Sequence, residues 1–232
     1  MKVSIIIPAY NEEKTLNEVV QRVYSVDLER IEKEVIISND GSSDGTRDVM
    51  ANLVKEFPNL KTYSSPTNLG KGAAVRLGMA ISTGDVIILQ DADLELNPAD
   101  YPNLLQPFLE NDADIVYGSR FLRKTANIPK RTRLSNWILT LFTNLLFGCH
   151  LTDMETGYKA FKRDLVKGLR LRCVRFDFEP EITAKFVMAG YRIKEIPVNY
   201  IPRTVTEGKK IAWRDGVEAL YTLLRCRFID QR

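Results

Sequence analysis

Apolar runs without internal alternation recur along the first half of the chain, and segments with helical spacing separate them. The first run covers residues 3–8, and the segment after it places apolar residues at positions 16, 19, 20 and 23, the spacing of one helix face. The pattern predicts strands at 3–8, 35–38, 60–64, 85–91 and 115–119, and helices at 15–26, after Asp44, at 73–81 and at 98–110. Strands of this kind, separated by helices, indicate an α/β domain with a mostly parallel sheet that carries helices on both faces.

The second half of the chain has a less regular pattern. Residues 120–133 hold six basic residues and no acidic one, and residues 148–153 have the composition of a turn. The later predicted elements are a helix at 180–189 with Pro180 at its first position, a strand at 192–200 and a terminal helix at 213–228. Because no repeat or linker interrupts the pattern, we expect a single domain over residues 1–232 with a basic C-terminal extension.

Composition excludes several classes of protein. A chain of 232 residues can bury roughly 70% of its surface, so a full hydrophobic core can form without disulfides or structural metal ions. The hydrophobic fraction of 44% and the charged fraction of 27% are globular values, which excludes disorder, collagen and coiled coil. Three scattered cysteines and one histidine suggest neither a disulfide framework nor a zinc site. The opening apolar stretch is too short for a signal peptide, so we expect a cytoplasmic protein.

The charge of the chain is divided unevenly between its halves. Residues 1–119 hold 10 Lys and Arg against 19 Asp and Glu, a net charge of −9. Residues 120–232 hold 23 against 11, a net charge of +12. A basic half indicates an anionic partner, and a nucleic acid, a membrane surface or a phosphorylated substrate would each supply one.

The segment Gly70-Lys71-Gly72 invites interpretation as a phosphate-binding loop. The dinucleotide fingerprint needs a third glycine where Val75 stands, and a Walker A loop needs Ser or Thr where Gly72 stands. Both patterns fail, so a turn at the entry of a helix is the favoured interpretation.

The segment 41–45 fits the G-x-S-x-G pattern of a serine hydrolase, with Ser43 as the nucleophile. It follows only the second strand, which leaves little chain for an oxyanion loop. The single histidine, His150, lies beside an apolar helix. A hydrolase that uses Ser43 is therefore a minor alternative.

The segment Asp91-Ala92-Asp93 has the clearest chemical meaning. Side chains at positions i and i+2 of a strand point to the same side, about 6.6 Å apart. Two carboxylates at the carboxyl end of a strand suit a hard divalent cation, and Glu95 adds a third. The alternative is that Asp93 or Asn97 only caps the next helix.

Five short motifs occur in order along the chain. They are PAYNE at 8–12, NDGSSDG at 39–45, NLGKG at 68–72, DAD at 91–93 and GSR at 118–120. Together they resemble the family 2 glycosyltransferases, which have the GT-A fold. Three later segments resemble the polyprenyl-phosphate branch of that family, the relatives of dolichyl-phosphate mannose and glucose synthases: DMETGYK at 153–159, FEPEI at 178–182 and RTVTEGK at 203–209.

The resemblance implies a nucleotide-sugar site in residues 1–119 and an acceptor site in residues 120–232. The implied nucleotide-sugar residues are Pro8, Tyr10, Glu12, Ser38, Asp40, Asp91, Ala92, Asp93, Arg120, Arg203 and Lys209. The implied ligands of Mg²⁺ or Mn²⁺ are Asp91, Asp93 and Glu95, and the implied catalytic residues are Asp91, Asp93, Arg120 and Arg203. The expected acceptor residues are Arg131, Arg133 and Asp153.

The expected reaction is transfer of a sugar from GDP-mannose or a UDP-sugar to a polyprenyl or dolichyl phosphate, with inversion at the anomeric carbon. Glu95 stands where mannose synthases often carry glutamine, so the donor sugar stays open. A lipid phosphate is already an anion and needs positioning more than deprotonation, so we expect Asp153 to bind rather than to act as a base. The alternative acceptor is a saccharide hydroxyl.

An apolar helix is predicted at residues 134–148, directly after the basic run. It would span about 22 Å, short of the ~30 Å hydrocarbon core. It is expected either to lie at a membrane interface, with the basic residues near anionic headgroups, or to be a core helix. The first alternative predicts a peripheral protein on the cytoplasmic face of the membrane. Candidate partners are then an anionic membrane surface and a membrane protein, with no nucleic acid.

Overall fold

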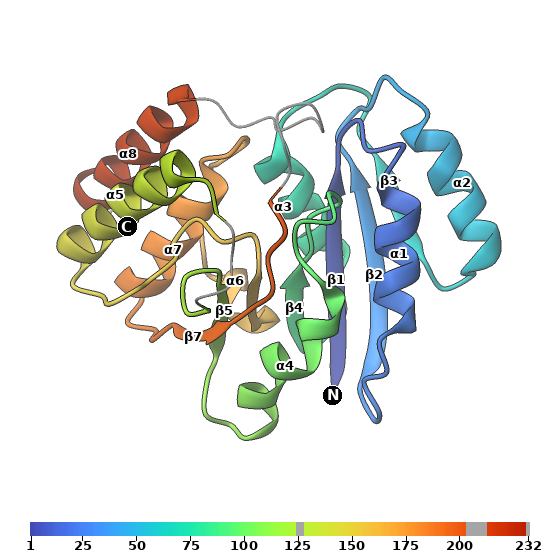
Figure 1. The fold of residues 1–232 in the computed structure, drawn as a ribbon, viewed down its shortest axis with the longest axis horizontal. Coiled ribbons are helices and arrows are strands. Elements are labelled where there is room, and N and C mark those ends of the chain that lie inside the picture. Colours follow the sequence, from blue (N-terminus) through green and yellow to red (C-terminus); the bar gives the residue numbers. More distant parts are fainter. Residues whose placement is uncertain (124–127, 203–212, 231–232) are drawn as a thin grey trace.

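The structure is a computed structural model that describes residues 1–123, 128–202 and 213–230. A seven-stranded sheet runs through the middle of the protein in the order β3-β2-β1-β4-β6-β5-β7 (Figure 1). Its strands are β1 (Lys2–Ala9), β2 (Glu32–Asn39), β3 (Lys61–Ser64), β4 (Val86–Leu89), β5 (Ile115–Ser119), β6 (Lys159–Lys162) and β7 (Lys194–Pro197). Neighbouring strands are parallel except that β6 is antiparallel to both β4 and β5. The carboxyl ends of β1, β2, β4 and β5 therefore lie along one edge of the sheet, together with the first residue of β6.

Helices cover both faces of this sheet, as predicted. They are α1 (Leu16–Ser25), α2 (Thr46–Glu56), α3 (Lys71–Ile81), the 3-10 turn η1 (Pro98–Asp100), α4 (Tyr101–Leu109), α5 (Lys130–Phe147), α6 (Arg163–Lys167), α7 (Phe178–Met188) and α8 (Trp213–Phe228). Successive residues of a strand point to opposite faces. In β1, Ile5 and Ile7 pack with α1, α2 and α4, whereas Ile6 packs with α3 and α7. Both faces need apolar residues, which explains the runs without alternation.

A third apolar cluster joins α5, α7 and α8 on one side of the molecule (Figure 1). Its buried members include Leu139 of α5, Ala184 of α7 and Leu223 of α8. No helix in the described parts of the chain is both long enough and apolar enough to cross a bilayer.

Several predicted boundaries are wrong, each for a local reason. The helix predicted at 180–189 begins at Phe178, so Pro180 is its third residue, where a missing N–H breaks no helical hydrogen bond. The helix predicted at 134–148 begins at Lys130, so three of the six basic residues in 120–133, Lys130, Arg131 and Arg133, lie in its first turn rather than ahead of it. Asp44 is one residue outside the N-cap, Gly45, although its Oδ1 accepts a hydrogen bond from the backbone N of Thr46 (3.0 Å).

The second half of the chain contributes directly to the sheet. The antiparallel strand β6 was not predicted, and it lies between β4 and β5 in the strand order. Strand β7 is shorter than the predicted segment 192–200 and pairs with β5. A basic C-terminal extension is not confirmed, because β6 and β7 belong to the same sheet as the strands of the first half.

Candidate active site

The D-x-D motif lies directly after β4, at the edge of the sheet where the parallel strands end. The strand stops at Leu89, two residues earlier than predicted, and Asp91, Ala92 and Asp93 form a turn instead of a strand end. Leu94 then adopts a positive φ of 64°, which is uncommon for a residue with a side chain. The expectation that the two aspartates point to one side because they share a strand is therefore wrong, and the turn decides where each carboxylate points.

A buried glutamine holds this turn at both ends. The side-chain Nε2 of Gln90 donates hydrogen bonds to the carbonyl oxygens of Asp91 (3.0 Å) and Leu96 (3.4 Å). Its Oε1 accepts hydrogen bonds from the hydroxyls of Tyr101 (2.8 Å) and Tyr158 (2.7 Å). Gln90 is fully buried, so the loop that carries the aspartates is fixed from the core side.

Lys71 lies at the centre of the site. Its Nζ is 2.7 Å from Oδ1 of Asp91 and 2.7 Å from Oε1 of Glu179, which belongs to α7. Burial disfavours the ammonium group, but the two carboxylates outweigh it, so the pKa of Lys71 is raised. Burial likewise opposes ionisation of Asp91, and Lys71 outweighs it, so the pKa of that carboxyl is lowered. Lys71 and Asp91 therefore both stay charged at neutral pH.

Asp91 is also confined from its other side. A Cβ added to Gly157 would lie 2.1 Å from Oδ2 of Asp91, so only a glycine leaves room for this carboxylate. With Oδ1 on Lys71 and Oδ2 against Gly157, Asp91 is held in one place by the rest of the protein.

Asp93 and Glu95 have the chemistry that a divalent cation requires. Oδ1 of Asp93 accepts a hydrogen bond from the backbone N of Glu95 (3.1 Å), and Oε2 of Glu95 accepts one from the hydroxyl of Tyr200 (3.0 Å). Both carboxylates are partly exposed at the turn, and such oxygens suit Mg²⁺ or Mn²⁺. Asp93 and Glu95 thus fit the implied metal, whereas an oxygen of Asp91 is already paired with Lys71.

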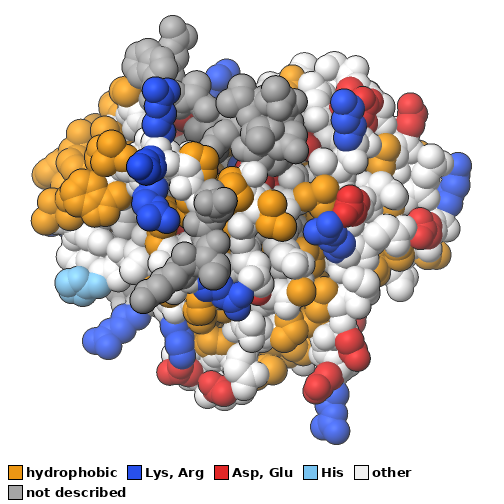
Figure 2. All heavy atoms as spheres, viewed as in Figure 1, with side chains coloured by type: hydrophobic (Ala, Val, Ile, Leu, Met, Phe, Trp, Pro, Cys, Tyr) orange, Lys and Arg blue, Asp and Glu red, His pale blue; other side chains and the backbone are white. Residues whose placement is uncertain are grey.

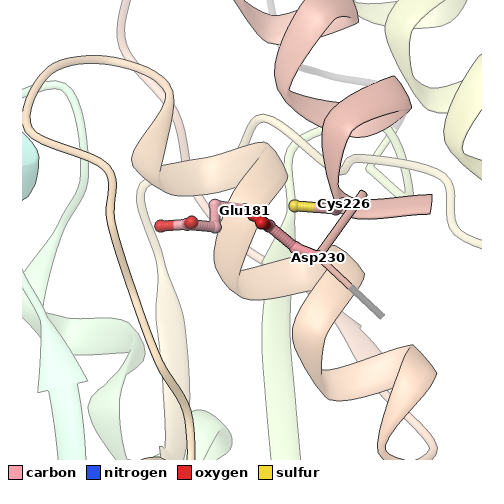
Figure 3. Close-up of side chains that lie close together, drawn as sticks. All are labelled: Glu181, Cys226 and Asp230. Atoms are coloured by element: carbon pink, nitrogen blue, oxygen red, sulfur yellow. The ribbon is translucent and has the colours of Figure 1, made fainter. Parts of the chain in front are cut away.

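A different cluster of potential metal ligands lies on the far side of α7. Within the described residues, one group of three ligand atoms falls within 4.8 Å, formed by Glu181, Cys226 and Asp230 (Figure 3). Arg225 approaches both carboxylates, at 3.0 Å from Glu181 and 3.3 Å from Asp230, and Arg172 lies 2.9 Å from Asp230. Burial also raises the pKa of the Cys226 thiol to about 11, which disfavours the thiolate that binds metal. The cluster is therefore an ion-pair junction between α7 and the end of α8.

Arg120 is held by a two-pronged ion pair after β5. Its Nε and Nη2 each lie 2.7 Å from an oxygen of Asp153, and its backbone N donates to the same carboxylate (3.0 Å). The guanidinium also stacks near the ring of Tyr200, at 5.2 Å from the ring centre. Asp153 is fully buried, and its paired hydrogen bonds fix the orientation of the guanidinium. The structure thus brings together Arg120 and Asp153, and the expected binding role of Asp153 stays a prediction.

Two further charged groups, Glu155 and Lys159, lie close to this ion pair. Burial and the nearby charge of Glu179 raise the pKa of Glu155 to about 7, and its Oε1 has no hydrogen-bond partner among the described atoms. Burial lowers the pKa of Lys159 to about 8, and its Nζ donates to the carbonyl oxygens of Met154 (2.8 Å) and Thr156 (2.6 Å). The site therefore contains titratable groups beyond the predicted ones.

Asp40 organises the loop that precedes α3. Its two carboxylate oxygens accept hydrogen bonds from the backbone N of Leu69 (2.8 Å) and of Gly70 (2.7 Å). Gly70 has a φ of 108°, and a Cβ there would lie 2.3 Å from the carbonyl oxygen of Val174. The segment is the helix-entry turn that the sequence favours, and it also delivers Lys71 into the site. A contact between Asp40 and a nucleotide base stays a prediction.

The remaining nucleotide-pocket residues after β1 and β2 differ in their surroundings. Pro8 and Tyr10 are partly exposed at the end of β1, and Asn11 follows with a positive φ of 53°. Glu12 is nearly buried, and its Oε2 accepts a hydrogen bond from Thr15 (2.7 Å). Two predicted residues are not at the surface of the site. Ser38 is fully buried beneath α3, and the side chain of Ala92 packs into the core.

The predicted acceptor residues lie in two places. Arg131 and Arg133 are exposed in the first turn of α5, whereas Asp153 is buried with Arg120. Arg203 and Lys209 lie outside the described residues. Ser43, the nucleophile of the hydrolase alternative, is exposed and its hydroxyl lies 3.4 Å from Oδ1 of Asn11.

Comparison with known proteins identifies the family. Residues 4–170 match the family "Glycosyl transferase family 2". A dolichyl-phosphate beta-glucosyltransferase of Trichomonas vaginalis is 33% identical over 85% of this chain and 65% of its own length. An undecaprenyl-phosphate mannosyltransferase of Micrococcus luteus is 30% identical over 90% of this chain and 87% of its own length. The chain thus spans about two thirds of the length of the first relative.

Solved structures agree on the fold. Glucosyl-3-phosphoglycerate synthase of Mycobacterium tuberculosis, crystallised with Mn²⁺, uridine diphosphate and phosphoglyceric acid, superposes with a TM-score of 0.75 at 21% identity. The superposition covers 98% of this chain and 79% of that one. The predicted GT-A fold is confirmed, and the relatives agree with the predicted branch. The family match, which covers most of the chain, leads to one conclusion: the protein belongs to glycosyl transferase family 2.

Proposed function

We propose that the protein transfers a sugar from a nucleotide-sugar to a polyprenyl phosphate, with inversion at the anomeric carbon. The observation that carries the proposal is a direct contact between the two halves of the site. The hydroxyl of Tyr200 bonds to Glu95 in the D-x-D loop, and the ring of Tyr200 lies over Arg120. Carboxylates suited to a metal and a fixed arginine suited to phosphate thus meet through one residue. The names of the relatives, which act on dolichyl and undecaprenyl phosphates, support the same acceptor class.

The donor side of the reaction rests on charge that is fixed before the donor binds. A divalent cation held by Asp93 and Glu95, with Asp91 as the further predicted ligand, would neutralise charge that the leaving diphosphate gains. Arg120 supplies a planar fork already aligned by Asp153, and such a fork matches phosphate geometry. Lys71 holds Asp91 in place. Positive groups arranged in advance stabilise a developing anion without reorganisation during the reaction.

The acceptor side needs positioning rather than a base. The phosphate of a polyprenyl phosphate is an anion at neutral pH and attacks the anomeric carbon from the side opposite the diphosphate. Both carboxylate oxygens of Asp153 accept hydrogen bonds from Arg120, which supports a positioning role for this carboxylate. Arg131 and Arg133 at the start of α5 are the proposed contacts of the acceptor, together with Arg203 and Lys209.

A polyprenyl chain is dissolved in a bilayer, so the proposed reaction takes place at a membrane surface. We propose a peripheral protein on the cytoplasmic face, where nucleotide-sugars are available. An anionic membrane surface is the proposed partner, and a membrane protein is a second candidate for the same role.

The test is a comparison of acceptors. Short, water-soluble polyprenyl phosphate, the matching free alcohol and simple sugars are each incubated with Mn²⁺ and radiolabelled GDP-mannose, UDP-glucose or UDP-mannose. We expect transfer to the phosphate alone, and the active donor identifies the nucleotide and the sugar. Asp93→Ala serves as the inactive control. Transfer to a sugar hydroxyl and none to the lipid phosphate would favour the saccharide alternative and contradict the proposal.

A further inference from the structure

Helix α5 exposes an apolar side to solvent, and several of its polar side chains are buried with Leu139 against the protein. Asn136, Thr140 and Thr143 are buried against the protein, and Thr140 and Thr143 use their hydroxyls in hydrogen bonds there. The exposed positions are apolar and follow the spacing of one helix face: Leu134, Trp137, Ile138, Leu141 and Leu145, with exposed fractions between 40% and 74%. A helix with this polarity is stable in water only at the expense of a large exposed apolar surface.

The neighbouring helix α8 also exposes apolar residues. Its exposed apolar residues are Val217, Tyr221, Leu224 and Phe228, and Ile229 follows directly after the helix. The buried sides of both helices belong to one apolar cluster with α7, through Leu139, Ala219 and Leu223 among others. Since both helices turn their buried sides toward α7, their exposed sides point away from it. We call these ten exposed residues the α5–α8 apolar face.

Positive charge borders this face. Figure 2 shows hydrophobic side chains gathered over α5 and α8, with Lys and Arg side chains along the margin of the group. Lys130, Arg131 and Arg133 are exposed in the first turns of α5, and Arg227 is exposed near the end of α8. Helix α5 contains no acidic residue.

We propose that the α5–α8 apolar face lies in the interface of a lipid bilayer that contains anionic lipid, with the basic margin on the headgroups. The inference rests on the proposed function, because a lipid-linked acceptor must reach the site. A bilayer accepts a face of mixed side chains without shape complementarity, and Trp137 and Tyr221 are the residue types that favour the headgroup level. A second copy of the chain fits the face less well, since a symmetric pair would bring two basic margins together.

Hydrogen bonds connect the inner side of α5 to the acceptor side of the site. The backbone N of Met154, next to Asp153, donates to Thr140 of α5 (3.1 Å). Asn144 of α5 bonds in both directions to the backbone of Leu151, through its Nδ2 and its Oδ1 (2.9 Å each). The segment that holds Arg120 is therefore anchored on the inner side of the helix whose outer side meets the lipid. Docking on the membrane would fix the depth at which the acceptor phosphate enters.

Tryptophan fluorescence gives the sharpest test, because the chain has two tryptophans. In a Trp213→Phe variant, Trp137 is the only tryptophan, so the fluorescence comes from α5 alone. We expect its emission to shift to shorter wavelength on addition of vesicles of phosphatidylglycerol and phosphatidylcholine, and to be quenched by brominated acyl chains. The fraction of protein that sediments with vesicles should fall when salt is added, and it should be lower for vesicles of pure phosphatidylcholine than for vesicles that contain phosphatidylglycerol.

Matched substitutions separate the face from general surface hydrophobicity. Leu145→Asp, which changes the most exposed leucine of α5, should weaken vesicle binding at least tenfold. Leu109→Asp changes an exposed leucine of α4, outside the face, and should bind as the parent does. Circular dichroism and unfolding midpoints confirm that both variants are folded.

Three outcomes would overturn the proposal: no emission shift, equal vesicle binding by Leu145→Asp and the parent, or a stable dimer in sedimentation that Leu145→Asp dissociates. The proposed function is tested separately with the unmodified protein and a water-soluble polyprenyl phosphate. Failure of the reaction appears as no transfer to that acceptor, whereas failure of docking appears as no vesicle binding.

Discussion

The Nζ of Lys71 and the Oδ1 of Asp91 lie 2.7 Å apart in a largely enclosed site, and Glu179 is at the same distance from Lys71 on the other side. One ammonium group thus neutralises two carboxylates that come from different parts of the chain. Removal of one member of such a group leaves an uncompensated buried charge. The relationship makes Lys71 a structural requirement of the D-x-D loop.

Lys71→Met should lower the free energy of unfolding by about 3 kcal/mol, because Asp91 and Glu179 would face each other without a cation. Chemical denaturation measures this loss. Glu179→Gln in the Lys71→Met background should restore part of the stability, since it removes one of the two unpaired charges. Lys55→Met, on the exposed surface of α2, is the control and should change stability by less than about 0.5 kcal/mol. An equal effect of the two lysine substitutions would contradict the role of Lys71.

Asp93→Ala should reduce transfer at least hundredfold and leave the unfolding midpoint within a few degrees of the parent. The carboxylate lies at a partly exposed turn, so its loss costs little stability. The expected cause is loss of a metal ligand, which a Mn²⁺ titration of activity measures as a weaker apparent affinity. Full activity of the unmodified protein in excess EDTA would exclude a metal requirement.

Asp153→Asn should lower the transfer rate about tenfold or more without changing the shape of the pH–rate profile. Asparagine offers one acceptor oxygen where the carboxylate offers two, so Arg120 loses half of its fork and its alignment. A base would behave differently, because its removal abolishes the limb of the profile that reports its pKa. Loss of that limb in Asp153→Asn would show that Asp153 removes a proton.

Glu155→Gln should stabilise the protein at pH 8 and have little effect at pH 4.5. The pKa of Glu155 is raised to about 7 in the folded protein, from an ordinary value near 4.5. The folded state therefore holds a proton that the unfolded state releases, and stability falls as pH rises from about 4.5 to 7. Glutamine does not titrate, so the stability of Glu155→Gln lacks this fall with pH. Thermal unfolding of parent and variant between pH 4.5 and 8 measures the difference, which should grow with pH.

Glu34 provides the opposite case at the other end of the sheet. Its carboxylate accepts hydrogen bonds from Lys61 (2.6 Å), from Ser4, and from the N and Oγ1 of Thr83 (2.8 and 2.7 Å). Burial opposes its ionisation, but these donors outweigh it and lower the pKa of Glu34 to about 2. Its stabilising effect is present above pH 4.5 and is lost as pH falls toward 2. Glu34→Gln should therefore lose about 1–3 kcal/mol at pH 7, less at pH 3. A difference that does not shrink with acid would contradict this assignment.

The central part of the fold could be predicted from the sequence because its strands are buried on both faces. Short runs such as Ile5-Ile6-Ile7, which alternate with segments of helical spacing, predict buried strands, and they located β1, β2, β4 and β5. Strand β6 has only four residues, Lys159–Lys162, and two of them are lysines. Its place depends on pairing with strands far away in sequence, which local pattern does not contain.

The candidate site could be predicted in its motifs but not in its contacts. Asp91, Asp93 and Glu95 were found because their spacing is local. Lys71 was interpreted as part of a turn, since its importance arises only when α3 and α7 place it between two carboxylates. Gln90 gave no signal either, because a single glutamine after a strand has no motif. The roles of Arg203 and Lys209 stay predictions.

Tyr200, which touches both Glu95 and Arg120, has a thermodynamic consequence for the order of events in the reaction. A ligand that shifts Glu95 changes the balance of contacts around Arg120, so occupancy of one subsite alters affinity at the other. Linkage is reciprocal, and the factor by which the nucleotide changes the acceptor dissociation constant must equal the factor by which the acceptor changes that of the nucleotide. Tyr200→Phe keeps the ring and removes the hydroxyl, and it should bring that shared factor closer to one while both ligands still bind.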